Sequence, residues 1–123
     1  MTKTGYIVFA HGSRVESANE AVRIVARDLA GALVPHPVLA AFLELGQPSL
    51  ETAAHELAAT GVGRIVVLPY FLTLGLHMER DLPPILAHIS NAHNGLEVIA
   101  APPLDGHPAL IQILADRATQ LDS

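Results

Sequence analysis

Short apolar runs alternate four times along this chain with longer segments whose apolar residues recur at helical spacing. The runs occupy residues 6–10, 37–43, 64–72 and 96–101. Continuous apolar strands separated by amphipathic helices are typical of a parallel sheet that is covered on both faces. The sequence therefore predicts an α/β fold of the flavodoxin-like kind, a four-stranded parallel sheet with helices on both faces.

Capping residues set the expected starts of the first two helices. Ser13 with Glu16, or Ser17 with Glu20, fits a capping box ahead of the first helix. Pro48 is expected at the first position of the second helix, where its missing N–H has no helical partner to lose.

Prolines and apolar spacing constrain the last two helices. Pro83 and Pro84 fit the third helix only within its first turn, which leaves His77 in the preceding loop. The fourth helix is predicted to carry one apolar face, formed by Leu110, Ile113, Leu114 and Leu121.

Length and composition narrow the function. The 123 residues suit a single domain over 1–123, and half of them are hydrophobic. The absence of cysteine excludes disulfides, thiolate metal ligands and cysteine nucleophiles. No signal-peptide pattern or membrane-length apolar run occurs, so we expect a cytoplasmic protein that binds no membrane. A net charge of −5, with one lysine and six arginines, argues against nucleic-acid binding.

Seven histidines are the unusual feature of the composition. His11, His77 and His107 each follow a predicted strand, and Glu44 follows the remaining strand. Right-handed crossovers bring the carboxyl ends of parallel strands to one edge of the sheet, where α/β proteins commonly bind ligands. These four side chains are therefore predicted to gather along one rim. The other histidines are expected to have surface or structural roles: His36, His55, His88 and His93.

His11 lies between a strand end and a helix N-terminus. The helix dipole there disfavours an imidazolium ion and leaves a neutral ring with a lone pair for a metal. Gly12 permits close approach of a ligand to the backbone. A hydrogen bond within the turn is the alternative role. Residue 10 is Ala where histidine phosphatases have Arg, which excludes that family. The α/β-hydrolases are excluded as well, because no G-x-S-x-G nucleophile elbow occurs.

The other rim candidates also have two interpretations each. Gly75 before His77 indicates an open backbone at a ligand site, and an exposed loop histidine is the alternative. Glu44 either contributes a carboxylate to the site or is simply exposed at the strand end. His107 is either a further ligand or the cap of the last helix.

Four motifs occur in an order that resembles one family over nearly the whole chain. They are HGSR at 11–14, FLELGQPSL at 42–50, LPYFLTLGLHMERDLP at 68–83 and PPLDGHPAL at 102–110. The chain is similar to the class II chelatases of tetrapyrrole biosynthesis, in their short sirohydrochlorin cobaltochelatase form. The resemblance implies that His11 and His77 bind the metal and that Glu44 takes part in catalysis.

The resemblance also implies contacts with a macrocycle that is rich in carboxylates. The acidic net charge leaves the positive partners to Arg14, Arg80 and the helix N-termini at the rim. Solvated surface pairs are the alternative for both arginines. The other residues expected to bind the substrate are Ser13, Gly46, Gly75 and Leu76.

The implied activity is insertion of a divalent metal, with cobalt expected, into sirohydrochlorin for cobalamin or sirohaem biosynthesis. Imidazole ligands suit nickel and ferrous iron as well, so a nickel chelatase and a ferrochelatase stay open. We expect His11 or His77 to accept the pyrrole protons, with Glu44 as the alternative. No organic cofactor is expected, and the family's short members pair as homodimers. The sequence is also compatible with a metal or tetrapyrrole carrier and with a purely structural module.

Overall fold

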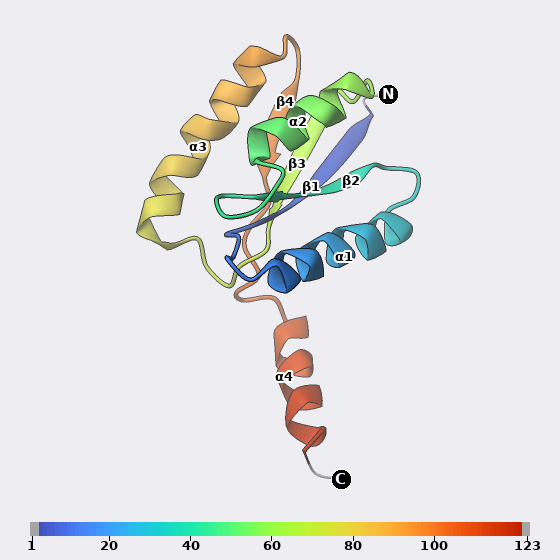
Figure 1. Cartoon of the computed structure of the whole chain (residues 1–123), viewed down its shortest axis with the longest axis vertical. Helices are drawn as coiled ribbons and strands as arrows, with labels where there is room; N and C mark the ends of the chain where they lie inside the picture. The colour runs from blue at the N-terminus through green and yellow to red at the C-terminus, as the bar shows by residue number, and fades with distance from the viewer. Residues whose placement is uncertain (1–2, 122–123) are drawn as a thin grey trace.

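A computed structural model describes residues 3–121, which contain four strands and four helices in alternation (Figure 1). The strands are β1 (Thr4–Ala10), β2 (Val38–Phe42), β3 (Arg64–Pro69) and β4 (Glu97–Ala100). The helices are α1 (Glu16–Ala32), α2 (Leu50–Ala59), α3 (Gly75–Ala92) and α4 (Ala109–Thr119). All strands are parallel, in the order β2-β1-β3-β4, which confirms the predicted fold. Within the described residues, no helix combines the length and apolarity needed to cross a lipid bilayer.

Two apolar layers hold α1, α2 and α3 against the sheet. α2 and α3 cover one face, where Ile7, Phe9, Ile65 and Val67 are buried. α1 covers the other face over β1 and β2, where Val8 is buried. The alternation of side chains along each strand separates the two layers.

α4 is not packed on its own sheet. The helix contains no buried residue, and it extends away from the rest of the chain (Figure 1). Leu110, Ile113 and Leu114 of the expected apolar face lie on it, whereas Leu121 follows its last residue. Leu114 remains 65% exposed. The α1 side of β3 and β4 is left uncovered, where Val66 and Leu68 are half-buried and Ile99 is 37% exposed.

The first two helices begin differently from the capping predictions. α1 starts at Glu16 without a side-chain cap, so neither predicted capping box forms. Ser13 Oγ instead accepts a hydrogen bond from the N–H of Val15 at 3.0 Å, within the preceding turn. Ser49 caps α2 by accepting a backbone N–H three residues later at 3.1 Å, and Pro48 lies before this cap rather than at the first helical position.

α3 begins earlier than the prolines indicate. It starts at Gly75, so His77 lies in its first turn rather than in a loop, and Pro83 and Pro84 lie in its interior. Each proline removes the N–H that would bond to the carbonyl four residues earlier. Those carbonyls belong to exposed residues, so water can replace the missing donors.

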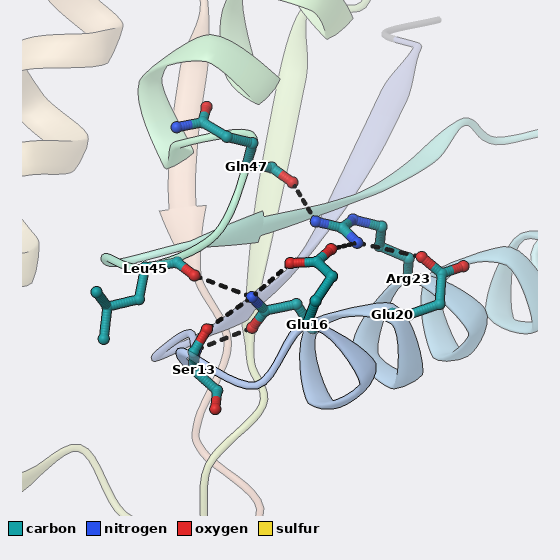
Figure 2. A network of polar contacts seen from close by, with 7 residues as sticks. Ser13, Glu16, Glu20, Arg23, Leu45 and Gln47 are labelled. Carbon is teal, nitrogen blue, oxygen red and sulfur yellow. Dashed lines mark hydrogen bonds and ion pairs between the residues drawn. The ribbon is translucent and has the colours of Figure 1, made fainter.

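A buried asparagine on α1 fastens the loops that follow β1 and β2 (Figure 2). Asn19 is 1% exposed. Its Oδ1 accepts the N–H of Ser13 at 2.9 Å, and its Nδ2 donates to the carbonyls of Ser13 and Leu45, each at 2.9 Å. Leu45 has a left-handed φ of 59°, which is unfavourable for a residue other than glycine. The amide thus satisfies three backbone groups and holds a strained turn in place.

An ion-pair network surrounds this amide (Figure 2). Nη1 of Arg23 lies 2.6 Å from Glu16 and 3.1 Å from Glu20, and its Nη2 donates to the Gln47 carbonyl at 3.0 Å. Hydrogen bonds from Arg23 and Asn19 lower the pKa of Glu16. The bonds to Glu16 and Glu20 raise the pKa of Arg23. The network joins the outer side of α1 to the loop that follows β2.

Replacing Asn19 by alanine is expected to lower the free energy of unfolding by about 3 kcal/mol, because three backbone groups lose their partner. Urea denaturation followed by circular dichroism measures this change. Asn91→Ala, at an exposed position on α3, is the matched control and should change the stability by less than about 0.5 kcal/mol. An equally small effect of Asn19→Ala would contradict the fastening role.

Replacing Glu16 by glutamine is expected to lower the unfolding temperature at pH 7 and to change it little at about pH 3. A carboxyl with a lowered pKa in the folded state stabilises the fold above its ordinary value of 4.5. That contribution is lost as the pH falls through the lowered pKa. Thermal unfolding across this range measures the effect, with Glu56→Gln on the exposed side of α2 as the control. A difference from wild type that does not depend on pH would refute the assignment.

Candidate functional site at the carboxyl edge of the sheet

Backbone hydrogen bonds draw together the loops that follow β1 and β2. The N–H of Leu43 donates to the carbonyl of Ala10 at 2.9 Å, and the N–H of Glu44 donates to the carbonyl of His11 at 3.0 Å. The two loops thus continue the pairing of their strands beyond the sheet. His11 and Glu44 are therefore neighbours, as the topology predicts.

Gly12 makes this close pairing possible. It has a φ of 95°, and a Cβ at this position would lie 1.6 Å from the carbonyl oxygen of Glu44. The sequence indicated room for a ligand at Gly12, whereas the structure places the neighbouring loop there. Any side chain at residue 12 would displace the loop that carries Glu44.

The loops after β3 and β4 complete the rim. The N–H groups of Leu104 and Asp105 donate to the carbonyls of Phe71 and Leu72, at 3.1 and 2.8 Å. The imidazole of His11 packs on the ring of Phe71, with centroids 4.4 Å apart and 34° between the planes. His11 is thus held between the loops that follow β2 and β3, while it remains exposed to solvent.

His77 is exposed in the first turn of α3, and its ring contacts an arginine three residues later. Nη2 of Arg80 lies 3.3 Å from Nδ1 of His77, and Nε of Arg80 lies 3.0 Å from Asp81. A guanidinium can only donate, so Nδ1 of His77 is the acceptor and carries a lone pair. The same lone pair becomes available to a metal when Arg80 moves away.

Two residues expected at the substrate support the loops instead. The N–H and carbonyl of Ser13 are both bonded to the Asn19 amide. A Cβ on Gly46 would lie 2.8 Å from Cγ of Phe42, so this glycine lets the loop pack against the core. Gly46 therefore has a packing role in this loop, and its contact with a substrate stays a prediction.

The remaining rim residues differ in role. Arg14, Gly75 and Leu76 are exposed, as contact with a substrate requires. His107 has the structural role that the sequence left open, because its Nδ1 accepts the N–H of Ala109 at 3.0 Å and caps the first turn of α4.

Asn19 and Phe71 were not among the predicted site residues. Asn19 lies three and seven residues before Val22 and Ala26, on the side of α1 that is buried. A polar residue on such a stripe is a signal that the sequence contains. Phe71 gives no comparable signal, because its contact with His11 depends on how two distant loops meet.

The candidate metal ligands form an open arrangement. Among residues 3–121, no three histidine, aspartate or glutamate side chains are grouped so that they could hold one ion. A structural metal site has four protein ligands, whereas an ion that is to be transferred needs free coordination positions. Exposed imidazoles at His11 and His77, with Glu44 beside His11, suit transient binding of a divalent ion.

Known proteins are similar to this chain in sequence and in fold. The CbiX family model matches residues 5–121. A sirohydrochlorin cobaltochelatase from Methanothermobacter thermautotrophicus is 32% identical, over 94% of this chain and 90% of its own. A chloroplastic sirohydrochlorin ferrochelatase from Arabidopsis thaliana is 31% identical, over 92% of this chain and 50% of its own. The crystal structure of a CbiX protein assigned to cobalamin biosynthesis, from Marinobacter aquaeolei, has a TM-score of 0.82 and 26% identity over 95% of both chains. The chain described here belongs to the CbiX family.

Proposed function

We propose that this chain is a chelatase of tetrapyrrole biosynthesis that inserts a divalent metal, preferably cobalt, into sirohydrochlorin. The observation that carries the proposal is the Methanothermobacter cobaltochelatase, which aligns over nearly the whole of both chains. The exposed imidazoles of His11 and His77 at one rim supply the ligands that such a reaction needs. A cytoplasmic location and a single domain over 1–123 remain predictions.

Arg80 links metal binding to substrate binding in this proposal. In the free protein its guanidinium occupies Nδ1 of His77, at 3.3 Å. A carboxylate of the macrocycle is a stronger partner for a guanidinium than a neutral imidazole is. Substrate binding therefore draws Arg80 away and frees the lone pair of His77 for the metal, while Arg14 takes a second carboxylate.

Metal insertion releases two pyrrole N–H protons, which need acceptors at the rim. Once the metal has passed from His77 to the macrocycle, the lone pair on Nδ1 is free to accept one proton, and the exposed ring of His11 is the other imidazole available. Glu44 lies beside His11 and is the alternative base. The exposure of all three groups allows the protons to pass on to water.

The ligand set does not by itself select the metal. Imidazole binds cobalt, nickel and ferrous iron. The Methanothermobacter relative is named a cobaltochelatase and the Arabidopsis relative a ferrochelatase. We place cobalt first because the cobaltochelatase aligns over most of both chains, whereas this chain spans half of the ferrochelatase.

An anaerobic absorbance assay with metal-free sirohydrochlorin and cobalt is expected to show insertion that depends on the protein. His11→Ala or His77→Ala should slow it about a hundredfold, because each removes one metal ligand. His88→Ala, at an exposed position on α3, is the control and should retain the full rate. Parallel reactions with nickel and ferrous iron rank the metals.

Three results would contradict this proposal. Binding of the macrocycle without faster insertion would indicate a carrier. Full activity in both rim variants would place the reaction elsewhere on the chain. No spectral change with any of the three metals would leave only the fold.

We further propose that two copies pair through α4. Two apolar surfaces are uncovered in one copy. One is formed by Ile111, Ile113 and Leu114 of α4, and the other is the α1 side of β3 and β4. The loop before α4 is bonded to the loop after β3 through Leu104 and Asp105, and α4 extends away from its own sheet (Figure 1). The α4 of a second copy would cover Val66, Leu68 and Ile99, and the exchange would be reciprocal about a twofold axis. This chain also spans half of the Arabidopsis relative, so two copies match its length.

Light scattering after size-exclusion chromatography is expected to give a dimer of the wild-type chain. The double substitution Ile113→Asp and Leu114→Asp should yield monomers with reduced chelatase activity, because it removes apolar surface that pairing would bury. The fold of one copy should tolerate it, because both side chains are exposed there. Gln112→Lys, on the same helix, is the control and should remain dimeric. A monomeric wild-type chain, or a dimer that survives the double substitution, would refute this pairing.

A further inference from the structure

We infer that His55 and His93 form a second site for a divalent metal, separate from the rim. His55 is exposed on α2, and His93 follows the last turn of α3. Their ring centroids lie 5.3 Å apart, with the planes tilted by 42°. Two imidazoles that bind one tetrahedral ion, with each nitrogen about 2.0–2.1 Å from it, have ring centres roughly 5 Å apart. The observed separation therefore matches the one that a shared ion requires, once a ring nitrogen of each side chain is turned toward it.

The ring nitrogens of this pair are free among residues 3–121. In that part of the chain the ring nitrogens of His36, His77 and His107 form hydrogen bonds, whereas those of His11, His55, His88 and His93 form none. A histidine that serves the fold generally uses a ring nitrogen in a hydrogen bond, as His107 does at the start of α4. Among the described histidines that lack such a bond, His55 and His93 are the pair whose rings lie next to each other, so both have ring nitrogens available to one ion.

The backbone segments that carry both histidines are held in place by hydrogen bonds and core packing. The N–H of His93 donates to the carbonyl of Ser90 at 3.3 Å, and the carbonyl of His93 accepts the N–H of Leu96 at 3.0 Å. The Oγ of Ser90 also donates to the carbonyl of Leu96 at 2.6 Å. His55 stands on α2, which is anchored in the core by buried residues that include Leu57. Ligands on rigid elements lose little conformational entropy when the ion binds.

The surroundings suit a weak, exchangeable ion. No third histidine or carboxylate among the described residues joins the pair to form a three-ligand group, so water fills the remaining coordination positions. A cavity of about 270 Å³ beside His93, lined also by Gly63 and Asn94, has room for these waters. His93 precedes β4, so the pair lies near the amino edge of the sheet, away from the rim. Imidazole ligands favour nickel, copper, zinc and cobalt.

The test uses the full chain with His11→Ala and His77→Ala, so that the rim ligands cannot contribute. Calorimetric titration with nickel chloride at about pH 7.5 is expected to show one ion per chain. Adding His55→Gln or His93→Gln should weaken binding at least about tenfold. His88→Gln, an exposed histidine on α3 outside the pair, is the matched control and should leave the affinity unchanged.

Thermal unfolding separates loss of the site from loss of the fold. In the presence of a chelator, all variants should unfold at the temperature of the parent. Nickel should then raise the unfolding temperature of the parent and of the His88→Gln variant only, because an ion that binds the folded state stabilises it. A parent that binds no nickel, or equal affinity in the His55, His93 and His88 variants, would overturn the inference. The site does not rest on the chelatase proposal, and His55→Gln with an intact rim should retain any insertion activity.

Discussion

The hydrogen bond from the Asn19 amide to the Leu45 carbonyl is the contact on which the geometry of the rim depends. The position of Asn19 is fixed by α1, which packs on the sheet through neighbouring buried residues. Leu45 holds an unfavourable backbone conformation that this bond stabilises. The adjacent residue, Glu44, bonds to His11 through the backbone, and the absence of a side chain at Gly12 permits that approach. Packing of α1 therefore determines where the backbones of Glu44 and His11 come together at the rim.

The two candidate metal ligands contact groups that a metal or substrate can displace. His11 packs on Phe71, and His77 accepts a weak hydrogen bond from Arg80. Neither contact is strong enough to compete with coordination of a divalent ion, and both rings are exposed. An enzyme that takes up an ion and gives it to a macrocycle needs this combination of accessible ligands and modest affinity. The uncovered surfaces of α4 and of the sheet are the basis of our proposal that a second copy completes the cleft.

Much of the fold and the candidate site follows from the sequence, because both depend on local periodicity and on parallel topology. The adjacency of His11 and Glu44 follows from strands whose carboxyl ends share one edge. The start of α3 could not be predicted, because exposed carbonyls let the helix accommodate Pro83 and Pro84. Contacts between distant loops could not be predicted from the sequence either. The pairing of His55 with His93 is one such contact, since it joins side chains that are far apart in the sequence.

The most direct test of the central claim is the anomalous scattering of cobalt in crystals of the full chain grown with cobalt and sirohydrochlorin. We expect a cobalt peak at the rim, within about 2.3 Å of a ring nitrogen of His11 and of His77. The guanidinium of Arg80 should have left His77 and should face a carboxylate of the macrocycle. Crystals in which cobalt is bound elsewhere on the chain but is absent from the rim would contradict the proposed roles of His11 and His77.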